Sequence, residues 1–309
     1  HRDLHSFHTR RSSDLTAGII QRETIVKVPQ LPIQYSRVTR CYDTIFGGIG
    51  GDAYNVANAL KWLGDDVTLV SNIGERDSHL FQTKHLDPRY VFASLEQTPS
   101  AVIFYDSERK LQTFEDIKDM EEVPYDMARF AEALAEADLV ILSNTKFCEP
   151  FLAPVKESGK KLVVNFNGLD RENELDQKFL TVADIIYVSD DEIKSDPYEA
   201  MRIMSEEYSM ECGILGMGKA GLLMYTRADN MVVPYPAVHI KEVVNTVGAG
   251  NALLSCFLHY YHKNGNYHEA IKYALMFAAY KIGYVGTSKG FMTEDEMKLW
   301  YDLIWNRYK

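Results

Sequence analysis

The stretch that decides the fold is Asn245-Thr-Val-Gly-Ala-Gly-Asn251, which runs directly into the apolar segment Ala252-Leu-Leu-Ser-Cys-Phe-Leu-His-Tyr-Tyr261. The apolar segment predicts a buried helix, and the Gly-Ala-Gly residues put little side-chain bulk at its start. The first N–H groups of a helix lack acceptors within the helix and lie at the positive end of its dipole. This junction is therefore a candidate site for a phosphate or a developing negative charge. An ordinary turn in which Asn251 caps the helix explains the local sequence equally well.

The composition is that of a globular protein and argues against several kinds of partner. With 309 residues, of which 46% are hydrophobic and 25% charged, the chain can bury one large core. The net charge of -11 argues against nucleic acid or an anionic membrane as a general partner. No apolar run reaches the roughly 18 residues that a membrane-spanning helix needs. The sequence therefore predicts neither a nucleic-acid-binding nor a membrane-spanning protein.

The first fourteen residues are basic and rich in histidine, and they show no hydrophobic periodicity. We expect residues 1–14 to be a disordered leader or a non-native remnant rather than a metal site built from the three histidines. They contain no apolar region typical of a signal peptide. The chain has four cysteines without CxxC spacing, which predicts isolated thiols in or near the core and a reducing, cytoplasmic setting. These are Cys41, Cys148, Cys212 and Cys256.

Short apolar strands alternate with helical patterns along most of the chain. Strands are predicted at 67–70, 139–142, 162–166, 184–188, 211–215 and 221–225, and helices at 56–63 and 123–137. The alternation predicts an α/β fold with a mostly parallel sheet covered on both faces. Residues 101–105 and 111–114 flank a polar turn and predict a hairpin in a separate small sheet. Residues 15–28, with a break at Gly18, and 37–46 are also strand-like.

A GxGxxA string at Gly48, Gly50 and Ala53 follows the strand-like residues 37–46 and precedes the first helix. It predicts a glycine-rich turn, and such a turn can bind a dinucleotide when an acidic residue ends the next strand. That strand ends in Ser71-Asn72 instead. A nicotinamide-dependent dehydrogenase is therefore an alternative that rests on the three small residues alone, and NAD binding would test it.

Two stretches together resemble the signatures of the ribokinase-like (phosphofructokinase-B) family of sugar and nucleoside kinases. The first is Gly50-Gly-Asp-Ala-Tyr-Asn-Val-Ala57, with Gly64 and Gly74 at the family's spacing. The second is the opening stretch, which is similar to the family's Asp-Thr-x-Gly-Ala-Gly-Asp motif. The resemblance covers nearly all of residues 15–309. It implies a three-layer kinase domain with a small β-sheet lid, at about 24–46 and 99–115, and a homodimer formed through that lid.

The resemblance also implies ATP and Mg²⁺ as cofactors, a monovalent cation as a further candidate, and a sugar or related polyol as substrate. Glu23 stands where the family usually has a sugar-binding Asp. The residues with implied roles are Glu23, Gly50, Gly51 and Asn55 for the sugar; Gly248, Ala249 and Gly250 for the anion hole, with Asn251 at the position of the catalytic base; and Ser189, Glu192, Gly216, Gly218, Gly221, Asn245 and Thr246 for the nucleotide and Mg²⁺, Glu192 acting indirectly on the metal.

Three departures from the family pattern fall in the same site. Asn251 replaces the family's Asp, and a carboxamide cannot accept the proton of an attacking hydroxyl. Ser189 and Gly216 replace an Asn and a Thr that organise the nucleotide phosphates. The sequence therefore predicts a sugar kinase whose activity is impaired or re-tuned, with a sugar- or nucleotide-binding pseudokinase as the alternative. If transfer occurs, water, the phosphate, Asp190 or Asp191 must take the proton.

Three other features have structural explanations. His259 lies in the apolar helix and is predicted to be a hydrogen-bonded core histidine. Lys219 is not a P-loop lysine, because no Ser or Thr follows it. The aromatic residues near the C-terminus have mostly helical spacing and predict a last packed helix. By the resemblance, residues 281–290 would line the adenine pocket.

Overall fold

The structure is a computed structural model that describes residues 13–81, 86–108, 110–190, 193 and 195–306. The predicted leader lies outside these residues except for Ser13 and Asp14, which already belong to the first strand. Across the described ranges, no helix combines the length and the apolar character that crossing a membrane requires.

A nine-stranded sheet forms the centre of the molecule, in the order β13-β12-β11-β10-β9-β8-β1-β4-β5. Its seven strands from β11 to β5 pair in parallel, and β12 and β13 add an antiparallel edge. The predicted mostly parallel sheet is confirmed. The strands are β1 Ser13–Ala17, β4 Asp66–Gly74, β5 Val91–Leu95, β8 Leu139–Ser143, β9 Lys161–Asn165, β10 Ile185–Ser189, β11 Cys212–Gly216, β12 Leu222–Thr226 and β13 Met231–Tyr235.

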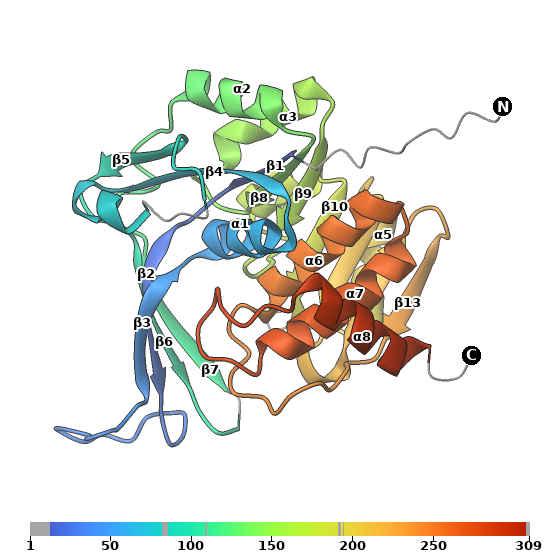
Figure 1. Ribbon diagram of the computed structural model, residues 1–309. Helices are drawn as coiled ribbons and strands as arrows, with labels where there is room; N and C mark the ends of the chain where they lie inside the picture. The colour runs from blue at the N-terminus through green and yellow to red at the C-terminus, as the bar shows by residue number, and fades with distance from the viewer. Residues whose placement is uncertain (1–12, 82–85, 109, 191–192, 194, 307–309) are drawn as a thin grey trace.

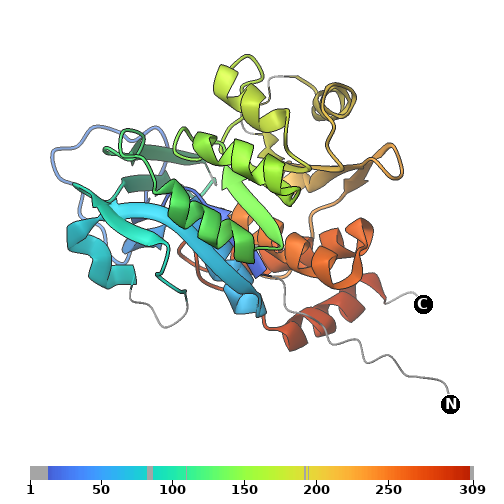
Figure 2. The same cartoon turned by 90° about the horizontal axis from the view of Figure 1, so that it is seen from above.

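Helices cover both faces of this sheet, as Figure 2 shows. One layer contains α1 Asp52–Leu63, α6 Ala249–Asn264, α7 Tyr267–Lys281 and α8 Glu294–Trp305, and the other contains α2 Met127–Glu136, α3 Leu152–Ser158, α4 Glu174–Leu180 and α5 Pro197–Glu207. Along β9, Val163 packs into the core under the first layer, whereas Leu162 and Val164 pack into the core under the second. Successive side chains of a strand point to opposite faces, so a continuous apolar run fills both cores.

Local signals set the ends of the helices. Gly64 ends α1 in the left-handed conformation, with φ 96°, as predicted. α2 begins at Met127, four residues later than the apolar pattern predicts, because the Asp126 side chain caps it and accepts from the Ala128 N–H at 2.9 Å. α8 confirms the predicted last helix.

Four strands form a second, smaller sheet in the order β3-β2-β6-β7, which extends below the main body in Figure 1. They are β2 Gln21–Lys27, β3 Ile45–Gly50, β6 Ser100–Tyr105 and β7 Leu111–Asp116. The hairpin of β6 and β7 in a separate sheet confirms the prediction. The strand-like residues 15–28 divide at Gly18, because β1 belongs to the central sheet and β2 to the small one.

The predicted glycine-rich turn before α1 is wrong. Gly48 lies inside strand β3, opposite Glu23 of β2, and only Gly51 separates the strand from the helix. Backbone pairing with β2 holds these glycines extended, so the GxGxxA string does not form the loop that a dinucleotide fingerprint requires. The cysteine prediction is correct for three buried thiols, but Cys41 is exposed.

Candidate active site

Polar side chains gather where the parallel strands of the central sheet end. Strands β8, β9, β10 and β11 end in Ser143, Asn165, Ser189 and Gly216, respectively. The carboxyl ends of parallel strands lie at one edge of a sheet, the usual place for a ligand in such folds. The N-termini of α1 and α6 reach the same edge, because Asn251 of α6 contacts the last residue of β9 and Asp52 of α1 contacts Asn167 just after it.

The N-terminus of α6 offers two free backbone donors. Gly248 is the N-cap, with φ 75° and no side-chain cap, so the alternative in which Asn251 caps the helix is wrong. The Ala249 N–H donates to the Thr246 carbonyl at 3.1 Å. Within the described residues, the N–H groups of Gly250 and Asn251 have no protein acceptor. The turn can therefore bind an anion with the N–H groups of Gly250, which was predicted for the anion hole, and of Asn251, which was predicted for the position of the base. The N–H of Ala249, also predicted for the anion hole, is used within the turn.

Asn251 is the third residue of α6, and its side chain reaches the end of β9. Its Oδ1 accepts a hydrogen bond from Asn165 Nδ2 at 2.9 Å. Its backbone carbonyl accepts from Ser255 Oγ at 2.7 Å. The carboxamide oxygen is thus oriented as an acceptor, but a carboxamide binds no proton near neutral pH. Sequence reasoning missed Asn165, since no motif marks it.

Tyr187 brings two of the predicted phosphate-binding glycines together. A Cβ at Gly216 would lie 3.0 Å from the Tyr187 hydroxyl oxygen, and one at Gly250 would lie 2.5 Å from it. The turn after β11 and the start of α6 therefore pack on one buried tyrosine of β10. Ser189 pairs with Gly216 across β10 and β11. Sequence reasoning also missed Tyr187, because its pattern is that of an ordinary strand residue.

Glu23 is buried and its carboxylate is occupied by protein donors. Oε1 accepts from the Gly51 N–H at 3.1 Å and from Gln21 Nε2 at 3.2 Å, and Oε2 accepts from Thr287 Oγ1 at 2.7 Å. A Cβ at Gly50 would lie 2.0 Å from Oε1, so this position must be glycine for the carboxylate to lie there. Gly50 and Gly51 were predicted to let a sugar approach the backbone closely. In this structure, the group that lies against Gly50 and accepts from the Gly51 N–H is the Glu23 carboxylate.

Asp52 and Asn55, on the first turn of α1, add polar groups to the same region. Asp52 Oδ1 accepts from the N–H groups of Ile19 at 3.1 Å and Ala53 at 2.8 Å, and Oδ2 accepts from Asn167 Nδ2 at 3.0 Å. Burial raises the pKa of the Asp52 carboxyl, and its hydrogen bonds oppose that shift. Among the described residues, the buried Oδ1 of Asn55 has no hydrogen-bond partner. An unpaired buried acceptor is costly, so a ligand hydroxyl is a fitting partner.

The sequence profile described as pfkB family carbohydrate kinase matches residues 41–294. This match spans both motifs and most of the chain. The chain belongs to the pfkB family of carbohydrate kinases. Family membership agrees with the ribokinase-like α/β fold and the separate four-stranded sheet.

One curated relative is the deoxyribokinase of Salmonella typhi, which is 28% identical over 191 residues. The aligned region covers 58% of this chain and 61% of the deoxyribokinase. The match therefore spans about three fifths of the relative's own length.

Solved structures share the fold at lower identity. A microbiome-derived acarbose kinase has a TM-score of 0.82 at 18% identity, over 94% of this chain and 98% of its own. Arabidopsis thaliana ribokinase, solved with ribose and ATP, has a TM-score of 0.74 at 15% identity, over 94% and 98% of the two chains. A structure assigned to Escherichia coli ribokinase II, which contains ATP and Mg²⁺, has a TM-score of 0.75 at 17% identity, over 94% and 99%.

Besides Ser189 and Gly216, which pair across β10 and β11, and Thr246, whose carbonyl accepts from Ala249, four further nucleotide residues were predicted for this pfkB-family chain. Asn245 is buried, and its Oδ1 accepts from the Val247 N–H at 3.2 Å while its Nδ2 donates to the Tyr284 carbonyl at 3.4 Å. Gly218 and Gly221, with φ 51° and 97°, shape the turn between β11 and β12. Glu192, like Asp191, lies outside the described residues. The described residues contain no group of three or more His, Cys, Asp or Glu side chains that could hold a metal ion.

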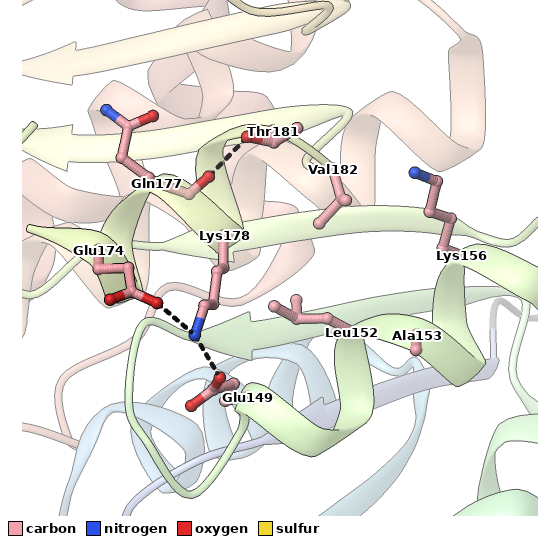
Figure 3. A pocket seen from close by; sticks show the side chains of 9 residues that line it. All are labelled: Glu149, Leu152, Ala153, Lys156, Glu174, Gln177, Lys178, Thr181 and Val182. Atoms are coloured by element: carbon pink, nitrogen blue, oxygen red, sulfur yellow. Dashed lines mark hydrogen bonds and ion pairs between the residues drawn. The ribbon is translucent and has the colours of Figure 1, made fainter.

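Two further features lie away from this edge. His259 Nδ1 contacts the Asp65 carboxylate at 2.8 and 2.9 Å inside the core, which confirms the predicted core histidine. A groove of about 530 Å³ lies between α3 and α4, where Lys178 forms ion pairs with Glu149 and Glu174 (Figure 3). None of the predicted site residues lines this groove.

Proposed function

We propose that this chain is an ATP-dependent kinase of a sugar or related polyol whose phosphoryl transfer is slowed or re-tuned by Asn251. The observation that carries the proposal is the start of α6, where two unpaired N–H groups and the Asn251 carboxamide occupy one helical turn. Family membership supplies the reaction class. The neighbouring Asn55 and Asp52 supply polar groups for substrate hydroxyls.

The phosphates would be held by the N–H groups of Gly250 and Asn251 and by the positive end of the α6 dipole. The bound ATP of the Arabidopsis and Escherichia coli structures supports this nucleotide. Mg²⁺ usually keeps several water ligands and binds mainly through substrate phosphates, so it needs few protein ligands here. When bound, it neutralises charge on the transferred group. Ser189, Thr246 and Glu192 stay candidates for that part of the site.

Removal of the hydroxyl proton needs a group other than Asn251. Asp190 and Asp191 stay candidates from the sequence. The structure adds Asp52, whose buried carboxyl has a raised pKa and lies beside Asn167 at the same sheet edge. A carboxylate with a raised pKa is a better proton acceptor near neutral pH. Phosphoryl transfer also depends mainly on positioning and charge, so a slow reaction can proceed without a strong base.

A pseudokinase is the second candidate, and the same asparagine favours it. A protein with the polar groups of α1 and the donors of α6, but with a carboxamide in place of the base, would bind sugar or nucleotide without turnover. Binding would stabilise the folded chain and raise its melting temperature, whereas no ADP would be released.

We further propose a homodimer formed through the small sheet, in a cytoplasmic setting. Val102 and Phe114 lie opposite each other on β6 and β7 and are 36% and 58% exposed, and Ile45 on β3 is 59% exposed. Exposed apolar side chains on a sheet are typical of an interaction surface. Light scattering coupled to gel filtration would measure the mass, and a monomer at micromolar concentration would contradict the dimer.

The experiment that tests the kinase proposal measures ADP release from MgATP with a panel of sugars, polyols and nucleosides, including ribose and deoxyribose. Thermal shifts with each compound are recorded in parallel. Substrate-dependent ADP release supports the kinase. Thermal shifts without ADP release favour the pseudokinase, and silence in both assays would refute both proposals.

A further inference from the structure

Lys281, the last residue of α7, is a buried cation close to the phosphate-binding turn. Its side chain is 0% exposed, and its ammonium donates a hydrogen bond to the Val247 carbonyl. Val247 immediately precedes Gly248, the N-cap of α6. The Lys281 amino group is therefore held next to the turn that offers its N–H groups to an anion.

A lysine in this position is expensive for the fold. Burial of an ammonium disfavours its charged form, and burial lowers the pKa of Lys281 to about 7. The negative charge of Glu23, on β2, opposes that shift. A methionine of similar length would fill the space without the desolvation cost. The cation therefore needs a role that an apolar side chain cannot perform.

The contacts around Lys281 suggest this role. The N–H groups of Val244 and Asn245 donate to the Ile282 carbonyl at 2.8 and 3.2 Å. A Cβ on Gly248 would lie 2.6 Å from the Thr287 carbonyl oxygen. The segment that leads into α6 thus lies along residues 281–287. Lys281 holds the Val247 carbonyl, and Asn245 Oδ1 accepts from the Val247 N–H.

The same segment is connected to the sugar side of the site. Thr287 Oγ1 donates to Glu23 Oε2 at 2.7 Å, and Glu23 Oε1 accepts from the Gly51 N–H at the start of α1. Glu23 and Lys281 are both buried, and the negative charge of Glu23 acts on the Lys281 amino group. The hydrogen bonds of Glu23 join strand β2, the start of α1 and Thr287, whose carbonyl lies close to Gly248 at the start of α6.

We propose that Lys281 is a positioning residue, a cation built into the chain that fixes the Val247 carbonyl and thereby the phosphate-binding turn of α6. Its effect on catalysis rests on the proposed kinase function, whereas its effect on the turn does not.

The first test measures the turn directly. Amide hydrogen exchange of peptides covering residues 244–252 is compared in the full-length wild type, Lys281→Met and Lys272→Met. Lys272 lies on the same helix and is partly exposed, so its variant is a matched control for loss of one ammonium. We expect exchange in this segment to be roughly tenfold faster in Lys281→Met alone, because a buried carbonyl loses its donor. Unchanged exchange there would overturn the proposal.

The second test is chemical rescue of catalysis. In Lys281→Ala we expect kcat/KM for ATP to fall roughly 10- to 100-fold. Ammonium chloride should raise kcat/KM of Lys281→Ala at least about fivefold. Tetramethylammonium chloride should leave it unchanged, because that ion cannot donate a hydrogen bond. The assay is repeated with Asn251→Asp added to each chain, so that a slow wild type does not hide the effect. A fall with no rescue, at an unchanged melting temperature, would refute the requirement for a cation.

The two tests separate this proposal from the proposed function. Faster exchange in residues 244–252, in a protein that phosphorylates no compound of the panel, would refute the kinase while the positioning role holds. Kinase activity that Lys281→Met retains in full would refute the positioning role and leave the kinase in place.

Discussion

Replacing Asn251 by aspartate should restore a proton acceptor to the site. In the structure, Asn251 Oδ1 already accepts from Asn165 Nδ2 at 2.9 Å, and an aspartate oxygen can accept the same hydrogen bond. The new carboxylate would lie in the first turn of α6, where the helix dipole favours a negative charge by about 0.3–1 kcal/mol. We therefore expect Asn251→Asp to fold at least as stably as the wild type.

The expected gain in rate follows from the chemistry of the base. A positioned general base contributes about 10²–10⁴ in rate, which corresponds to roughly 3–5 kcal/mol of transition-state stabilisation. We expect that gain in kcat, with KM for ATP changed little because the backbone donors are the same. The assay is ADP release with the best substrate of the panel, at saturating sugar.

The matched control is Asn264→Asp, the same substitution at the exposed C-terminal end of the same helix. It should leave the rate unchanged and lower the melting temperature slightly, because a negative charge is unfavourable there. If the wild type turns over and Asn251→Asp stays within about threefold of it, the reasoning is refuted and another group takes the proton. If both chains bind ATP but neither turns over, a missing base alone does not explain the inactivity.

Three further predictions concern stability. Thr287→Val should lower the free energy of unfolding by about 1–3 kcal/mol in urea denaturation, because Glu23 loses a buried donor; an unchanged midpoint would contradict this network. His259→Phe should cost a similar amount by leaving the Asp65 carboxylate without its partner, while KM values stay unchanged. The pKa of Lys281 is about 7 when folded and 10.5 in its ordinary state, so between these values the unfolded chain binds more protons and stability rises with pH. The difference in the free energy of unfolding between the wild type and Lys281→Met should therefore increase from pH 7 to pH 10. If the free energies of the two proteins change with pH in parallel, the lowered pKa of Lys281 is refuted.

The elements of the fold were predictable because their signals are local. A left-handed glycine ends α1. The apolar run of β9 has the length of a strand, and its lack of polar alternation predicts burial on both faces of the sheet. The misplaced elements are those in which a neighbour in space overrides the local signal. Gly48 is extended because β2 pairs with it, although glycines alone predict a turn.

Some features of the candidate site could likewise be predicted from the sequence, and others could not. The identity of Asn251 and the small residues before it are visible in the sequence, and so is the loss of the carboxylate. The partner Asn165, the packing of Tyr187 on Gly250, and the buried ammonium of Lys281 are not. Each is an ordinary residue until the fold places it.

The physical reason is the separation along the chain. Helix ends and strand patterns depend on hydrogen bonds and side-chain periodicity within a few residues, which the sequence alone determines. The contact between Glu23 and Thr287 joins residues 264 positions apart. Many donors and acceptors in the chain could satisfy each other, and only the packing of the sheet and its helices selects these pairs. The tertiary structure therefore decided that Glu23 is held by protein donors and that Lys281 lies beside the phosphate-binding turn.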